Sequence, residues 1–176
     1  MSCRKCGHSD CCCPNRVPFP VPVPVPGPAG PQGAAGANGT AASTDYALIY
    51  QSTAQSVDPQ TDVTFDTNGV IFGSIAHTVG DSIITINTPG NYKVIFSVTA
   101  QEENQFALFL NGTLVAGTIY GSNNVSQQNT GVAIITIAGT STLTLRNYIS
   151  TTPVLLETLA GGTANNVTAS ILIQKL

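Results

Sequence analysis

The sequence has little charge. Asp, Glu, Lys and Arg together make up 9% of its 176 residues, and tryptophan is absent. Lysine and arginine are scattered singly, so no basic stripe is present to release counterions from nucleic acid or to hold an anionic membrane. We therefore expect neither nucleic acid nor a membrane as a partner. A surface of Thr, Ser, Asn and exposed apolar side chains instead suits packing against other copies.

The sequence also lacks long apolar segments. Residues 1–10 are polar and charged with no apolar stretch behind them, and no run of about 18 apolar residues occurs anywhere. We expect no Sec signal peptide and no membrane span. Export would then follow another route, such as assembly inside a compartment that later lyses.

No cysteine follows residue 13, and all five cysteines lie close together near the N-terminus. Zinc is one interpretation, although three consecutive cysteines cannot all turn to one metal. The odd number favours disulfide cross-linking between chains over zinc and over a reactive Cys–His pair. We assign residues 1–16 to cross-linking or anchoring and expect no cofactor. The cross-linking candidates are Cys3, Cys6, Cys11, Cys12 and Cys13, and the zinc set would be Cys3, Cys6, His8 and Cys11.

Proline occupies every second position of residues 17–26. Each proline fixes its own φ and drives the preceding residue out of the α region, so the run is held extended. At about 3.1 Å per residue it reaches about 30 Å. The run is either a spacer or a connector that docks on a neighbouring subunit. The candidate docking side chains are Val17, Phe19, Val21, Val23 and Val25.

Glycine then occupies every third position, at Gly27, Gly30, Gly33, Gly36 and Gly39. A collagen triple helix requires this period because only glycine fits at its crowded axis. So few triplets cannot hold three chains together unaided. We therefore predict that residues 27–41 form a short triple-helical neck nucleated by the domain that follows, in preference to a flexible linker.

Residues 42–176 have the pattern of a β-domain. Apolar side chains alternate in residues 91–100, 106–110, 142–149 and 167–173, with the period of two that a sheet requires. Turn signals such as Asn68-Gly69 and Asn111-Gly112 separate these segments, and no segment shows a helical period. Roughly eight to ten short strands predict an all-β jelly-roll sandwich.

Two predicted strands, in residues 83–86 and 132–137, are apolar on both faces. One face of each would pack on the partner sheet, and the other face needs a second cover. A neighbouring copy is the simplest candidate. With glycine at every third position just upstream, we expect a homotrimer.

Acidic residues and histidine in this domain show no pattern of a catalytic or metal site. His77 lies near Asp81 but has no evident nucleophile, so we interpret it as an ordinary surface or core histidine. Asp58, Asp62 and Asp66 lack the alternating oxygens and fixed glycine of a calcium loop. We expect them to be solvated loop carboxylates.

The domain resembles the trimeric jelly-roll domain of BclA-type collagen-like glycoproteins of the Bacillus exosporium, itself similar to the complement and tumour-necrosis-factor head. The resemblance depends on the order and spacing of Val63–Gly69, Ile84–Val94, Phe106–Gly112 and Ala169–Lys175. It implies homotrimers, a spore-surface location, a collagen-like stalk and no catalytic residues. This chain has a Cys- and Pro-rich arm in place of a long collagen region, and in this it looks like a subunit of fibrous endospore appendages.

We therefore expect a non-enzymatic structural subunit of an extracellular spore-surface fibre. The N-terminal arm of one subunit would dock on the next trimer. The alternative is a trimeric ligand-binding or adhesion head that its Cys-rich tail tethers to the exosporium. The expected partners are other copies of the chain and an exosporium or spore-coat anchor protein.

Overall fold

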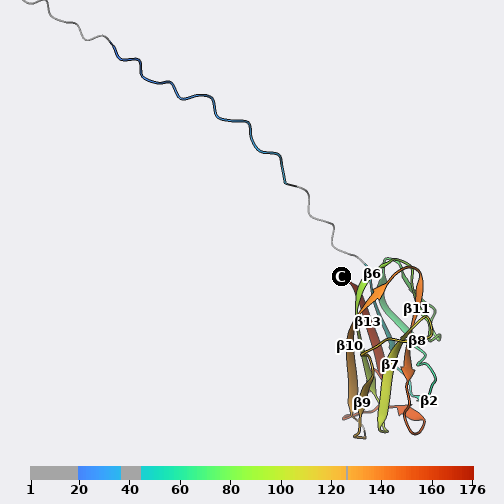
Figure 1. Cartoon of the computed structure of the whole chain (residues 1–176). Helices are drawn as coiled ribbons and strands as arrows, with labels where there is room; N and C mark the ends of the chain where they lie inside the picture. The colour runs from blue at the N-terminus through green and yellow to red at the C-terminus, as the bar shows by residue number, and fades with distance from the viewer. Residues whose placement is uncertain (1–19, 37–44, 126) are drawn as a thin grey trace, which may run out of the picture. The chain divides into compact units, whose positions relative to one another are not determined.

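The computed structural model describes residues 20–36, 45–125 and 127–176, and the chain divides into two units, Met1–Gly39 and Thr40–Leu176. In the first unit, residues 20–36 run as an extended chain without helix or strand (Figure 1). Val21, Val23 and Val25 are 83–88% exposed. The cysteines, His8, Val17, Phe19 and Gly39 lie outside the described residues. A search of the described residues for a helix of membrane-spanning length and hydropathy finds none.

The second unit is built from strands alone. Thirteen strands are present in its described residues. They are β1 (Tyr46–Gln51), β2 (Gln55–Val57), β3 (Thr67–Phe72), β4 (Ile75–His77), β5 (Ile84–Ile86), β6 (Gly90–Thr99), β7 (Asn104–Leu110), β8 (Thr113–Leu114), β9 (Tyr120–Ser122), β10 (Gln128–Ile137), β11 (Ser141–Asn147), β12 (Val154–Leu156) and β13 (Ala169–Lys175).

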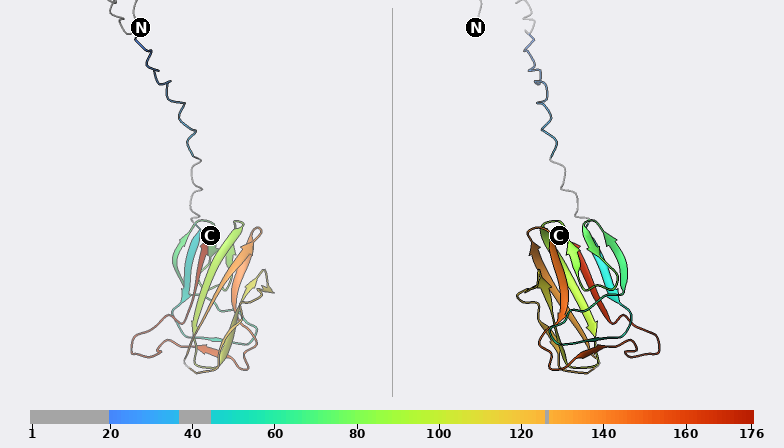
Figure 2. Two further views of the ribbon diagram at one scale, coloured as in Figure 1. Left: turned by 60° about the vertical axis from the view of Figure 1, so that its left-hand side comes forward. Right: turned by 90° about the vertical axis from the view of Figure 1, so that its right-hand side faces the viewer.

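The strands form two facing sheets, which Figure 2 shows as two layers. One sheet has five strands in the order β10-β6-β13-β1-β3, and the other has six in the order β4-β5-β11-β7-β8 with β9 also paired to β7. A small third sheet pairs β12 with β2. Because Tyr46 pairs with Gln174, the described start and the end of this unit lie at the same end of the sandwich. The predicted all-β sandwich is confirmed.

The core lies between the two sheets. In β6, Tyr92, Val94, Phe96 and Val98 alternate inward and are at most 1% exposed. Phe106 and Leu108 of β7 meet them from the six-stranded sheet and are fully buried. β7 contains the whole segment predicted at 106–110, and β6 contains the segment predicted at 91–100 except Ala100.

The Asn111-Gly112 turn is confirmed. Asn111 and Gly112 have φ values of 51° and 75°, the left-handed pair that a tight hairpin between β7 and β8 requires. The second predicted turn is wrong, because Asn68 and Gly69 lie inside β3. There the pairing of β1 with β3 shifts register between Ala47 and Ile49.

Two strand predictions need further correction. The strand predicted at 142–149 ends at Asn147, because Ile149 adopts a left-handed φ of 54° that no strand accommodates. The segment 83–86 is not apolar on both faces. Ile83 precedes β5, whose middle residue Thr85 points outward while Ile84 and Ile86 are buried.

Asp45 fixes the beginning of β1 to two turns. Its carboxylate accepts hydrogen bonds from Ser74 Oγ at 2.7 Å and Thr88 Oγ1 at 2.6 Å, and Lys175 Nζ lies 3.7 Å away. These bonds, led by those from Thr88 and Ser74, outweigh the opposing effect of burial and lower the pKa of Asp45 to about 2.

We expect folding stability to fall as the pH drops from about 4 to about 2. The pKa of Asp45 is lower in the folded chain than in the unfolded chain, so its contribution is complete above the unfolded value of 3.8 and is lost as the carboxylate protonates. The loss at this residue is on the order of 1–2 kcal/mol. Urea unfolding at pH 6 and pH 2.5 measures it. Asp45→Asn should lose less between the two pH values, and an equal loss in both proteins contradicts the assignment.

Candidate functional site

The outward face of the five-stranded sheet carries a continuous line of apolar side chains. The strand registers place Val132 beside Ile95, Ile95 beside Leu172, and Leu172 beside Leu48. We call these four residues, from β10, β6, β13 and β1, the apolar row. Val132 is 52% exposed and Leu48 is 40% exposed. The row therefore crosses four adjacent strands and is open to solvent in a single copy.

More apolar side chains flank the apolar row. Ile134 of β10 is 70% exposed. Tyr46 of β1 and Phe72 of β3 stack near the edge of the sheet opposite β10, with ring centroids 5.6 Å apart, and both are exposed. Among the described outward-facing residues of these five strands, Lys93 is the one with a charged side chain. Both faces of 132–137 are apolar as predicted, except at Thr136: Val132 and Ile134 point outward, and Ile135 and Ile137 point into the core.

The outward face of the six-stranded sheet is different, because the chain itself covers the large aromatic side chain at its centre. Phe109 of β7 points outward yet is 6% exposed. The Arg146 guanidinium lies 4.1 Å from its ring centroid, and Tyr148 packs beside it. Asp62 holds Arg146 in place by two hydrogen bonds of 2.7 and 3.1 Å. The five-stranded sheet is therefore the candidate surface for self-association.

Two of the three aspartates predicted to be solvated are bound by the protein, so that prediction was wrong for them. Asp62 pairs with Arg146, and the pair raises the pKa of Arg146. For Asp66, burial raises the pKa, but hydrogen bonds from Thr67, Thr53 and Ser52 outweigh it and the net shift is downward. No three acidic, His or Cys side chains of the described residues gather as a metal site.

His77 has a structural environment. Its Nδ1 lies 2.6 Å from Asn68 Oδ1, and its Nε2 lies 3.0 Å from the carbonyl oxygen of Asp81. Asn68 in turn donates its amide to the carbonyl of His77. These contacts connect β3, β4 and the turn at Asp81.

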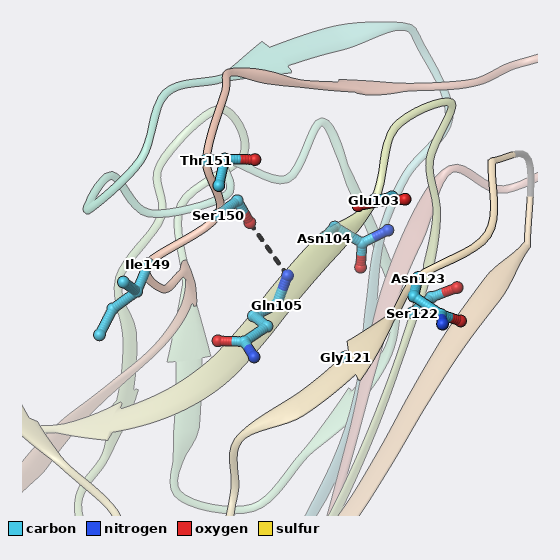
Figure 3. Close-up of a pocket in the computed structure, with 9 residues that line it drawn as sticks. All are labelled: Glu103, Asn104, Gln105, Gly121, Ser122, Asn123, Ile149, Ser150 and Thr151. Carbon is cyan, nitrogen blue, oxygen red and sulfur yellow. Dashed lines mark hydrogen bonds between the residues drawn. The ribbon is translucent and has the colours of Figure 1, made fainter.

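A second candidate site is a pocket of about 410 Å³, where β7 begins, β9 ends and β11 runs into its following loop (Figure 3). The polar groups at the floor of the pocket are hydrogen-bonded to one another. Asn129 Nδ2 donates to Asn104 Oδ1 at 2.9 Å, and the N–H of Gln105 donates to Ser150 Oγ at 2.9 Å. Because these groups already have partners, the floor is held in one arrangement.

The rim of this pocket has unused hydrogen-bonding groups. The side chains of Glu103, Gln105, Asn123 and Thr151 make no hydrogen bond to the residues that the structure describes. Ile149 beside them is 59% exposed and has a φ of 54°, which is strained for a β-branched residue. Sequence analysis missed this pocket, because its residues come from three separate segments with no shared motif.

Comparison with known proteins shows similarity in structure alone. No family model and no curated protein sequence matches the chain. The globular domain of zebrafish complement 1qA protein superposes with a TM-score of 0.58 at 11% identity, over 75% of this chain and 97% of that domain. Murine APRIL at pH 8.0 superposes with a TM-score of 0.51 at 10% identity, over 76% of this chain and all of that one (100%).

These superpositions agree with the order of strands found here. The first sheet places β10, β6, β13 and β1 side by side although they are far apart in the sequence, as a jelly roll requires. The β-domain of this chain therefore has the jelly-roll sandwich fold shared by the complement 1q head and APRIL.

Proposed function

We propose that this chain is a non-enzymatic structural subunit of an extracellular spore-surface fibre, in which homotrimers of residues 42–176 are joined through their N-terminal arms. The observation that carries the proposal is the apolar row. Four apolar side chains lie side by side on an otherwise nearly uncharged sheet face, whereas Phe109 on the opposite face of the sandwich is covered by Arg146 of the same chain.

Covering this face favours association. Fully burying a Val, Leu, Ile or Phe side chain contributes about 1.5–3 kcal/mol, so a half-exposed one still offers about 1 kcal/mol. Val132, Ile134, Leu48 and Phe72 are each 40–70% exposed. Such a patch on a soluble protein marks an interaction surface, and a second copy presents a matching one.

The glycines of the neck support three-fold association. A Cβ added at Gly27, Gly30, Gly33 or Gly36 would meet no atom within 4 Å in a single chain, and none of the four has a left-handed φ. Nothing in the described part of one copy therefore requires glycine there. Packing of three chains around one axis does require it at every third position.

The arm supplies the connection between trimers. Val21, Val23 and Val25 are almost fully exposed on an extended chain that loses little conformational entropy on docking. Cross-links from the cysteines between 3 and 13 would then hold the joint, or attach the first trimer to an exosporium or spore-coat anchor protein.

Light scattering on the full chain tests the first step. We expect a particle of three times the 18.1 kDa chain mass, or whole multiples of it. The measurement is made with and without reducing agent, because reducing agent breaks disulfide cross-links between trimers but leaves the contacts of the apolar row intact. A stable single copy at micromolar concentration in both conditions would exclude the proposal.

The pocket of Figure 3 favours a second candidate function, a trimeric ligand-binding or adhesion head. The described residues that line it offer amide, hydroxyl and carboxylate groups and no cationic side chain, which suits a neutral polar ligand better than a phosphate. A screen of neutral oligosaccharides against the full chain and Gln105→Ala tests it. Binding that Gln105→Ala weakens supports the head function, and absence of any binding removes the reason for proposing it.

A further inference from the structure

β10 is the free edge of the five-stranded sheet, and its ten residues pair with β6 alone. The backbone N–H of Thr99 donates a hydrogen bond to the carbonyl of Thr168, and the carbonyl of Asn91 accepts one from the backbone N–H of Leu176. The odd-numbered residues of β6 thus direct their backbone groups toward β13, so its even-numbered residues must bond to β10. Because Tyr92 lies opposite Ile135, the odd-numbered residues of β10 receive those bonds.

The even-numbered residues of β10 therefore direct their N–H and C=O groups past the edge of the sheet. The carbonyl of Val132 accepts a hydrogen bond of 2.9 Å from the Tyr120 hydroxyl, which agrees with this direction, and a strand added at this edge would replace that bond. Edge strands are usually protected from pairing by a charged side chain, a proline or a β-bulge. These five residues have none of the three. They are Gln128, Thr130, Val132, Ile134 and Thr136.

The other sheet edges are poor templates for an added strand. β3 has an irregular register with β1, and the Asn68 amide ties it to the carbonyl of His77 in β4. In the second sheet, β4 has three residues and β8 has two. Within the described part of the chain, β10 is thus the long regular edge that another chain could pair with.

The arm of the chain has hydrogen-bond donors on one edge only. In an extended strand, successive residues direct their backbone groups to opposite edges. Val21, Val23 and Val25 share one edge, and the prolines between them, which have no N–H, share the other. The valine edge can pair with a sheet, whereas the proline edge cannot accept another strand in regular pairing.

We propose that the arm of a second copy adds to the five-stranded sheet as a further edge strand, with its valine edge paired to the even-numbered residues of β10. The inference deepens the proposed function and rests on it, since it names where the connector docks. Residues 17–26 contain five residues with an N–H, and β10 directs five residues past its edge.

The side chains of the arm fit the same arrangement. Residues directly opposite each other in a sheet point to the same face. Val132 and Ile134 point outward, so the valines paired with them also point outward and extend the apolar row by one strand. The proline edge of the docked arm then becomes the outer edge of the sheet, and it cannot pair with a further strand. Each β10 edge therefore binds one arm, and the sheet does not grow further.

Competition by synthetic peptides tests the backbone pairing. Fibre assembly of the full chain is followed by sedimentation with an excess of the peptide of residues 17–26, or of the same peptide carrying N-methylvaline at 21, 23 and 25. The methyl groups remove three donors and leave the side chains in place. We expect the unmodified peptide to inhibit assembly and the methylated peptide to be about tenfold weaker or more. Equal inhibition by both would overturn strand pairing while leaving arm docking intact.

Failure of both peptides to inhibit assembly would overturn docking of the arm itself, and with it the fibre joint of the proposed function. Hydrogen exchange gives a readout without any variant. On assembly of the full chain from trimers, the amides of Ile134 and Thr136 should become protected, while Ile135 and Ile137 change little because they already bond to β6.

A matched pair of variants completes the test. Thr136→Pro removes a donor at the free edge without removing a bond to β6, and Thr136 is not one of the apolar side chains of the trimer face, so trimers should persist and fibres should be lost. Thr136→Ala keeps the donor and should still form fibres. If the protection at Ile134 instead appears in a chain lacking residues 1–26, two β10 edges pair with each other and the proposal is wrong.

Discussion

Leu172→Arg is expected to convert the proposed trimer into single folded copies. Leu172 lies at the centre of the apolar row, between Ile95 and Leu48. An arginine there would place a charge in the middle of an apolar interface, with no acidic side chain facing it on the five strands. Burying an unpaired charge costs several kcal/mol, so we expect the association constant to fall by at least about 100-fold.

Sedimentation velocity at a series of concentrations measures this shift, and circular dichroism checks that the sandwich remains folded. Thr85→Arg is the matched control, because Thr85 points outward at the centre of β5 on the other sheet. That variant should remain trimeric. If Leu172→Arg is as trimeric as the control, the outward face of the five-stranded sheet is not the interface.

Long, half-buried strands were predictable from the sequence. In β6, buried and half-buried side chains alternate because one face packs in the core, so the sequence itself shows the period of two. Short strands such as β8, with two residues, and β2, with three, have too few positions to show a period. This is why thirteen strands are found where roughly eight to ten were expected.

Alternation does not say what covers each face of a strand. The sequence of 132–137 predicted a strand that is apolar on both sides, and the structure shows one side exposed. The same argument failed at 83–86, because Ile83 lies before the strand and leaves Thr85 alone on the outward face. Where a strand begins decides which side chains share a face, and no signal in the sequence marks that residue.

Long-range partners were also beyond prediction. Asp62 was expected to be solvated, yet it pairs with Arg146, which is 84 residues away. The pocket of Figure 3 was missed for the same reason, since β7, β9 and the loop after β11 meet there only in the folded chain. Its strained residue, Ile149, follows a segment whose alternation favours continuation of the strand.

Deletion of residues 1–26 is expected to abolish fibres and to leave trimers intact. The deletion removes the cysteines and the Val-Pro connector but keeps the neck glycines, the apolar row and the whole core. Association through the apolar row does not involve the arm, so light scattering should still give a mass close to three copies. Negative-stain electron microscopy of the same sample should show separate particles, whereas the full chain should show filaments under oxidising conditions.

A full chain with serine at Cys3, Cys6, Cys11, Cys12 and Cys13 separates the two parts of the deleted segment. If the Val-Pro connector provides the docking and the disulfides only lock it, this variant should still form filaments, but they should dissolve in denaturant that leaves oxidised wild-type filaments intact. If it forms none, the cysteines themselves make the joint. If instead the chain lacking residues 1–26 still polymerises, the arm is a tether rather than a connector, because the contacts that build the fibre must then lie within the neck and the β-domain.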